Sequence, residues 1–308
     1  MNLRAAKLQG AVGGRVALVT GGTDGIGRAV AMQLARGGDR VLFVGRNRER
    51  GAEVLAALRE VRPGVEHAFL QADLSSLRET ANLAQQVARL TSRLDAVVFC
   101  AGVLSTVPEW TEEGLERNFV LNYLSRYLLA RLLLPSLIEA RSGRLVFVSN
   151  AGMYRDTLDF DDLQHRRGKR GLQVAGRTQF ANDLLATELA ERLRGTRVEV
   201  TCVFPGLVDT AVFRNARGLP RVVRAVASAL QRVMAIAPEA AAETPVFLAQ
   251  DREATGTSGY FYGPNLKYRP VPARALRQDR RNRLWAASDE LVQPYLPGRS
   301  VGPARCSA

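Results

Sequence analysis

Apolar and polar positions along the chain fall into blocks that favour strands and helices in turn. Uninterrupted apolar runs are typical of strands buried on both faces of a sheet. We expect such strands at 16–20, 41–44, 66–70, 95–100, 144–149, 198–204 and 259–262. Between them apolar residues recur at helical spacing, which predicts helices at 28–35, 48–61, 77–90, 111–140, 172–193, 208–235, 238–249 and 278–291.

This alternation predicts a single doubly wound α/β domain, with a parallel sheet and helices on both faces joined by right-handed crossovers. No linker or internal repeat divides residues 1–308. We expect the core to span about 14–268, followed by a helical, arginine-rich extension at about 269–308 that packs on the outside.

Composition narrows the class of protein. Apolar residues make up 46% and charged residues 24% of 308 residues, which favours a soluble globular core. Neither a signal peptide nor an apolar run of membrane-spanning length is visible. Cys100, Cys202 and Cys306 are widely spaced, which favours a reducing cytoplasm and no metal site. The net charge of +13 comes almost entirely from arginine, as in GC-rich bacterial proteins, and solvated surface explains it better than nucleic-acid binding.

A glycine-rich turn joins the first strand to the next helix. Gly21 permits a sharp turn, while Gly25 and Gly27 let backbone and helix approach a phosphate at the positive end of the helix dipole. The spacing Thr-Gly-x-x-x-Gly-Ile-Gly resembles that of short-chain dehydrogenases/reductases. The resemblance extends over about 16–296, and the C-terminal helix looks like that of retinol-dehydrogenase-like members.

This resemblance implies a nucleotide cofactor, and Arg46 indicates which one. An arginine after the second strand accommodates a 2′-phosphate, so NADP(H) is expected. Asp73 stands where the family holds adenine, although it could equally cap the next helix. Pro205 opens the segment that resembles the loop fixing the nicotinamide carboxamide. The expected cofactor-binding residues are Gly21, Thr23, Asp24, Gly25, Ile26, Gly27, Arg46, Asn47, Asp73, Leu74, Ala101, Gly102, Pro205, Gly206, Val208 and Thr210.

The family's catalytic pattern is altered in this chain. Carbonyl reduction needs a hydride on carbon and a proton on oxygen, and the family takes the proton from a tyrosine followed four residues later by a lysine. No Tyr-x-x-x-Lys occurs here: Ala175 and Gln179 align with the two positions. Ser149 and Asn150 replace the family's serine pair, and Asn122 matches its helix asparagine.

Several residues could compensate for these losses. Tyr154 follows the fifth strand closely and could donate the proton, although a partly buried loop tyrosine is an equal interpretation. Gln179 could bind the ribose. His165 and Lys169 have the spacing of a substitute pair, but an exposed basic loop explains them better. Apolar residues within 208–235, the family's lid region, indicate either a lipophilic substrate or ordinary packing.

Three hypotheses about function follow. The first is an NADP(H)-dependent oxidoreductase that acts on a carbonyl or alcohol of a lipophilic small molecule with an atypical proton donor. The second is a non-redox enzyme, a cyclase, isomerase or lyase, on the same scaffold. The third is a non-catalytic NADP(H)-binding protein. The three hypotheses stay open because fold alone does not choose between functions. A small-molecule partner is expected, and a homodimer or homotetramer is compatible with the sequence.

Overall fold

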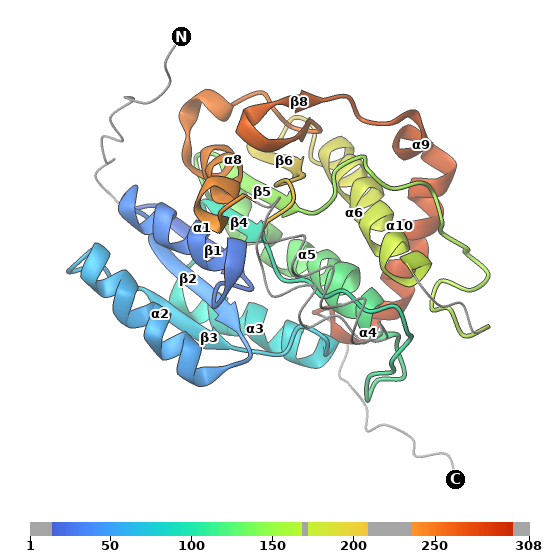
Figure 1. The fold of residues 1–308 in the computed structure, drawn as a ribbon, viewed down its shortest axis with the longest axis horizontal. Coiled ribbons are helices and arrows are strands. Elements are labelled where there is room, and N and C mark those ends of the chain that lie inside the picture. Colours follow the sequence, from blue (N-terminus) through green and yellow to red (C-terminus); the bar gives the residue numbers. More distant parts are fainter. Residues whose placement is uncertain (1–13, 168–171, 209–235, 298–308) are drawn as a thin grey trace.

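A sheet of eight strands forms the centre of the structure (Figure 1). The computed structural model describes residues 14–167, 172–208 and 236–297. The strands lie in the order β3-β2-β1-β4-β5-β6-β7-β8, parallel throughout except between β7 and β8. They are β1 (Val16–Thr20), β2 (Arg40–Gly45), β3 (Ala68–Gln71), β4 (Ala96–Phe99), β5 (Gly143–Val148), β6 (Val198–Val203), β7 (Phe261–Tyr262) and β8 (Tyr268–Arg269). The predicted α/β architecture is confirmed.

Helices cover both faces of this sheet (Figure 1). On one face lie α1 (Gly25–Arg36), α2 (Arg48–Val61) and α8 (Pro238–Gln250). On the other lie α3 (Leu77–Leu90), α5 (Ser125–Ile138), α6 (Leu172–Arg192) and α10 (Gln278–Val292). The short helices α4 (Arg117–Phe119) and α9 (Ala273–Leu276) lie before α5 and α10 in the chain.

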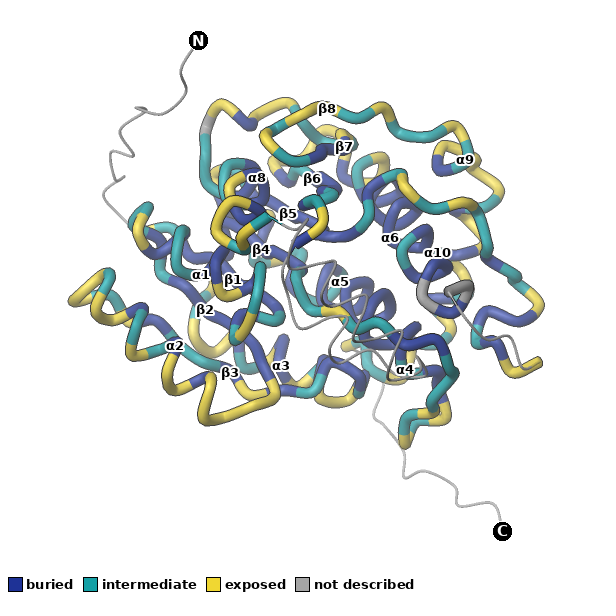
Figure 2. Tube along the Cα trace, in the orientation of Figure 1, coloured by how far each residue is buried: buried dark blue, intermediate teal, exposed yellow. Residues whose placement is uncertain are grey.

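Two apolar cores follow from the alternation of side chains along each strand. Leu18 and Phe99 face α3, α5 and α6, where Phe99 stacks on Phe147 of β5 with ring centroids 4.7 Å apart. Val19 and Val98 face α1 and α8. Figure 2 shows the central strands buried and the outer side of α2 exposed.

The helix predicted at 111–140 begins later than expected. Residues before Glu116 form a loop, and α4 starts at Arg117 because the Glu116 carboxylate accepts the backbone N–H groups of Asn118 and Phe119. A π-helical turn at Val120–Leu124 then leads into α5. Such turns occur frequently at functional sites.

The C-terminal helix is part of the main core and does more than cover the outside. Leu284 and Val292 of α10 are buried in the same cluster as α5 and α6. The Tyr123 hydroxyl lies 2.8 Å from Ser288 Oγ, and the Tyr127 hydroxyl donates to Asp289 at 2.7 Å. Helix α10 thus buries one face against α5 and α6, and most of its other residues are exposed or half-buried, so it packs on the outside of these helices while contributing to the core.

The sheet order places a crevice at the carboxyl ends of the central strands β1 and β4. Strand β1 pairs with β2 on one side and with β4 on the other, so the chain changes direction across the sheet at this point. In open parallel sheets ligands bind outside the carboxyl ends of the strands at such a position. The glycine-rich turn after β1 lies there.

Candidate active site

The turn between β1 and α1 is sterically restricted to glycine. Gly21 has a φ of 68°, and a Cβ added to it would lie 2.9 Å from the backbone nitrogen of Ala101. A Cβ on Gly27 would lie 2.2 Å from the carbonyl oxygen of Gly21. Asp24 caps α1 by accepting the N–H of Gly25 at 2.8 Å. The backbone can therefore approach a bound phosphate at the N-terminus of α1.

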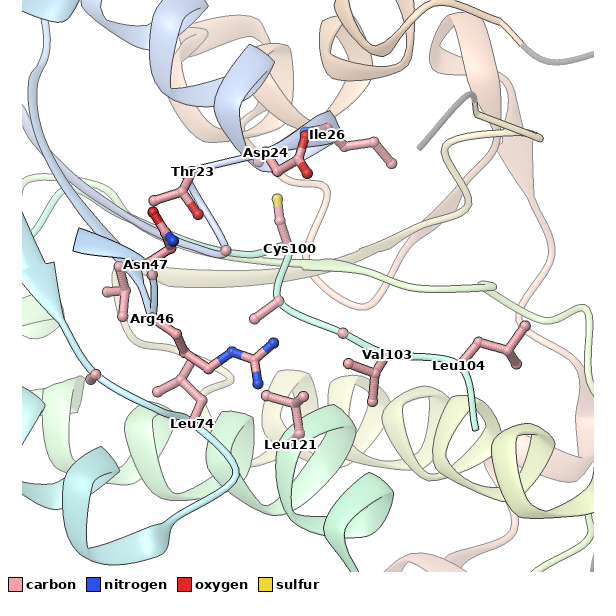
Figure 3. Close-up of a pocket in the computed structure, with 18 of the residues that line it drawn as sticks. Thr23, Asp24, Ile26, Arg46, Asn47, Leu74, Cys100, Val103, Leu104 and Leu121 are labelled. Carbon is pink, nitrogen blue, oxygen red and sulfur yellow. The ribbon is translucent and has the colours of Figure 1, made fainter. Parts of the chain in front are cut away.

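A cavity of about 750 Å³ opens above this turn. Its size lies within the range of small-molecule and cofactor sites. Figure 3 shows the Arg46 side chain projecting into it and the Cys100 side chain pointing toward the turn that carries Asp24 and Ile26. Predicted residues that line it are Gly21, Thr23, Asp24, Gly25, Ile26, Gly27, Arg46, Asn47, Leu74, Ala101 and Gly102.

Basic side chains gather at the β2 end of the cavity. Arg46 Nη1 lies 3.7 Å from Asp73 Oδ2, and Arg50 Nη1 lies 2.9 Å from Asp24 Oδ2. Asn47 caps α2 by accepting the N–H of Arg50 at 2.7 Å. The two guanidinium groups are exposed, so a phosphate could compete for them with the aspartates.

Asp73 lies beside the cavity, and its predicted cap role is wrong. Helix α3 is capped by Ser76, whose hydroxyl accepts the N–H of Glu79. The Asp73 carboxylate instead accepts from the backbone and the hydroxyl of Ser75 at 2.9 and 2.7 Å. Its other oxygen faces Arg46, so Asp73 stays available to orient this arginine.

The carboxyl end of β4 is held in place by polar side chains. Thr20 Oγ1 accepts the N–H groups of Cys100 and Ala101, each at 3.2 Å. Asn122, from the π-helical turn, accepts the Val103 N–H at 2.8 Å and donates to the Val103 carbonyl at 3.0 Å. The Asn122 side chain thus fixes the strand that leaves β4, while its predicted catalytic role stays a prediction.

An arginine that was not predicted from the sequence also reaches the carboxyl end of β4. Arg126 of α5 is buried and donates to the carbonyls of Ala101 and Val148 at 2.8 and 3.0 Å. A signal was present, because Arg126 interrupts an otherwise largely apolar stretch at 119–130. Cys100 was likewise missed, although it lines the cavity.

The predicted catalytic residues after β5 have different neighbours and do not form one cluster. The Ser149 hydroxyl is turned into the core, 3.2 Å from Cys202 Sγ. The Asn150 N–H donates to Gln179 Oε1 at 3.2 Å, so these two residues meet. The ring of Tyr154 packs against α6, where a Cβ on Gly176 would lie 3.1 Å from it. Burial raises the pKa of the Tyr154 hydroxyl.

Asp183 is a buried carboxyl group that the sequence analysis also missed. It is only 1% exposed, and its Oδ2 accepts the Gly152 N–H at 3.0 Å. Its Oδ1 lies 3.9 Å from Cys202 Sγ. Burial outweighs the nearby positive charges of Arg274 and Arg269 and raises the pKa of Asp183 to about 7. Asp183 therefore holds the loop that carries Asn150 and Tyr154.

Two further sets of predicted site residues are the loop after β6 and the pair His165 and Lys169. Pro205, Gly206 and Val208 follow β6, and Gly206 has a φ of 94°. Thr210 and nearly all of the predicted lid at 208–235 lie outside the described residues. His165 is buried, at 2% exposure, so its assignment to an exposed loop is wrong. Lys169, its supposed partner, lies outside the described residues.

Within the described ranges no helix is long and apolar enough to cross a bilayer. The same ranges contain no group of three or more His, Cys, Asp and Glu side chains placed to hold a metal ion.

Comparisons with known proteins agree with this geometry. The family model described as short chain dehydrogenase matches residues 15–157. Retinol dehydrogenase 14 of Homo sapiens is 32% identical over 296 residues, which cover 92% of this chain and 88% of that protein. Polyprenol dehydrogenase of Mus musculus is 35% identical over 279 residues, which cover 89% of this chain and 82% of that protein.

Solved structures show the same arrangement. A short chain dehydrogenase from Shigella flexneri, crystallised with NADP, superposes with a TM-score of 0.62 at 27% identity, covering 81% of this chain and 96% of that one. A short chain dehydrogenase from Escherichia coli, crystallised with NADPH, gives the same TM-score and identity, covering 81% of this chain and 95% of that one.

Proposed function

Because the chain belongs to the short-chain dehydrogenase/reductase family, we propose that it is an NADP(H)-dependent oxidoreductase that interconverts a carbonyl and an alcohol of a lipophilic small molecule. The cavity above the glycine-rich turn, with Arg46 reaching into it, is the observation that carries this proposal. Two solved neighbours contain NADP or NADPH, and two relatives are named for retinol and polyprenol. These names favour a lipophilic alcohol or aldehyde as substrate.

The bound nucleotide would supply or accept the hydride. Residues Gly21 to Gly27 would hold its phosphates through backbone N–H groups, and Arg46 with Arg50 would hold the 2′-phosphate. Gln179 stands where the family's lysine binds the ribose, and its amide remains a hydrogen-bonding group without a charge. Asn150 keeps a polar side chain at the end of β5, whereas the Ser149 hydroxyl is turned toward Cys202.

Tyr154 is the proposed proton donor. It packs against α6 at Gly176, beside the position where the family places its tyrosine. Its pKa is raised by burial, so it retains its proton at neutral pH and can donate it only to a strongly basic oxyanion. A donor without an adjacent cation predicts slow turnover.

The absence of Tyr-x-x-x-Lys from the chain also favours a second candidate function. A protein that keeps the nucleotide site but cannot protonate an oxyanion would bind NADP(H) without hydride transfer, or use the scaffold for non-redox chemistry. The cytoplasm remains the proposed location, since Cys100 and Cys202 are both free thiols.

Turnover of NADPH with a panel of long-chain and isoprenoid aldehydes tests the proposal. We expect oxidation of NADPH, followed by its absorbance, with Tyr154→Phe lowering kcat by about 10²–10⁴-fold at unchanged affinity for NADPH. Tyr295→Phe, near Arg78 and Glu113, is the matched control and should leave kcat unchanged. Equal kcat for Tyr154→Phe and the wild type would exclude Tyr154 as the donor. Tight NADPH binding with no oxidation of the panel would favour the second candidate.

A further inference from the structure

Arg126 is a buried cation placed between two strands of the site. It lies within α5, and its side chain is turned inward with 4% exposure. Nη2 donates to the Ala101 carbonyl at the end of β4, and Nη1 donates to the Val148 carbonyl at the end of β5. One planar group thereby fixes the distance between the two strand ends, because both bonds leave a rigid guanidinium.

Within residues 14–167, 172–208 and 236–297, no carboxylate pairs with the charge of Arg126. Among the ion pairs of the described residues none involves Arg126, and its Nε makes no hydrogen bond there. The titratable groups that influence its pKa are the thiols of Cys100 and Cys202. Burial raises the pKa of both thiols, that of Cys100 to about 12, so they are uncharged at neutral pH. Burial lowers the pKa of Arg126 only to about 10, so the cation persists.

Arg126 lies directly behind the wall of the cavity. Cys100, Ala101 and Gly102 line that wall, and a Cβ added to Gly102 would lie 3.9 Å from Arg126 Nη2. The basic residues Arg46 and Arg50 mark the opposite, β2 end of the cavity. A dinucleotide whose adenosine lies at that end must extend its nicotinamide across β1 toward β4 and β5.

We propose that Arg126 makes the site favour NADPH over NADP⁺. The oxidised nicotinamide ring carries a positive charge and the reduced ring does not. The Arg126 cation behind the wall, which no carboxylate of the described residues neutralises, therefore repels only the oxidised ring. The two hydrogen bonds hold this charge at the strand ends and prevent it from moving away to solvent. Arg126 is thus a positioning residue for the nicotinamide half, and the proposal rests on the proposed NADP(H) binding.

Calorimetric titration of NADPH and NADP⁺ tests this directly. The wild type should bind NADPH more tightly, and Arg126→Met should lower the ratio of the two affinities by about fifteenfold, the effect of one unit charge acting over roughly 10 Å at an effective dielectric constant of about 20. Arg126→Lys should keep most of the ratio. Arg131→Met removes an arginine of the same helix that pairs with Asp289 at the surface, and it should leave the ratio unchanged.

Each outcome bears on the inference. Equal affinities of the wild type for NADPH and NADP⁺ would overturn it, and this result does not depend on how well the variants fold. A ratio in Arg126→Met that equals the wild-type ratio would overturn it as well. Failure of the wild type to bind either nucleotide would instead remove the proposed function, and the inference with it.

Discussion

Replacing Asp183 by asparagine should abolish a specific pH dependence of stability. Burial raises the pKa of Asp183 from 3.8 to about 7 in the folded chain. Between these values the folded chain binds a proton that the unfolded chain has released, so the free energy of unfolding falls as the pH rises from about 4 to about 7. A shift of about three units corresponds to at most about 4 kcal/mol.

The surroundings of Asp183 explain why burial prevails there. Arg274 lies near, but its guanidinium donates to the carbonyls of Tyr154 and Gly152, and not to the carboxylate. The Gly152 N–H and the Cys202 thiol are the groups that face Asp183 directly. An asparagine keeps an oxygen that can accept the Gly152 N–H, so the variant should fold.

Urea denaturation followed by tryptophan fluorescence at a series of pH values measures this effect. The free energy of unfolding of Asp183→Asn, minus that of the wild type, should increase between about pH 4 and about pH 7 and stay constant above it. A difference that does not change with pH over this interval would refute the reasoning, because Asp183 would then titrate alike in both states.

Two other substitutions test the packing around the cavity. Glu116→Gln leaves the fully buried Arg177 without its carboxylate partner and should lower the free energy of unfolding by about 3–5 kcal/mol; a loss below about 1 kcal/mol in the same denaturation assay would contradict a buried ion pair. Gly27→Ala places a Cβ 2.2 Å from the Gly21 carbonyl oxygen and should weaken NADPH binding by more than about tenfold. Gly14→Ala, which meets no atom within 4 Å, is the control and should bind as the wild type does.

The elements that local sequence specifies were the ones that could be predicted. The turn at Gly21 and Gly27 was visible because steric demands there admit only glycine. Arg46 was predictable because its position follows from the end of β2. The alternation of strands and helices also follows from apolar periodicity, which each segment carries by itself.

Features set by distant partners were missed. Helix α4 begins only at Arg117 because Glu116 caps it while also pairing with Arg177, 61 positions along the chain. Strand β8 exists through its antiparallel pairing with β7, and two residues show no pattern of their own. Arg126 and Asp183 are buried by tertiary packing, so their perturbed pKa values arise from contacts that sequence spacing does not reveal.

The proposed binding of NADP(H) depends most on the nucleotide cradle and on Arg46. Titrating the wild type and Arg46→Ala with NADPH and NADH therefore tests it most directly. We predict that the wild type binds NADPH at least about tenfold more tightly, since a guanidinium holds the 2′-phosphate, and that Arg46→Ala binds both nucleotides alike. Equal affinity of the wild type for NADPH and NADH would contradict the role of Arg46, and binding of neither would contradict the cradle itself.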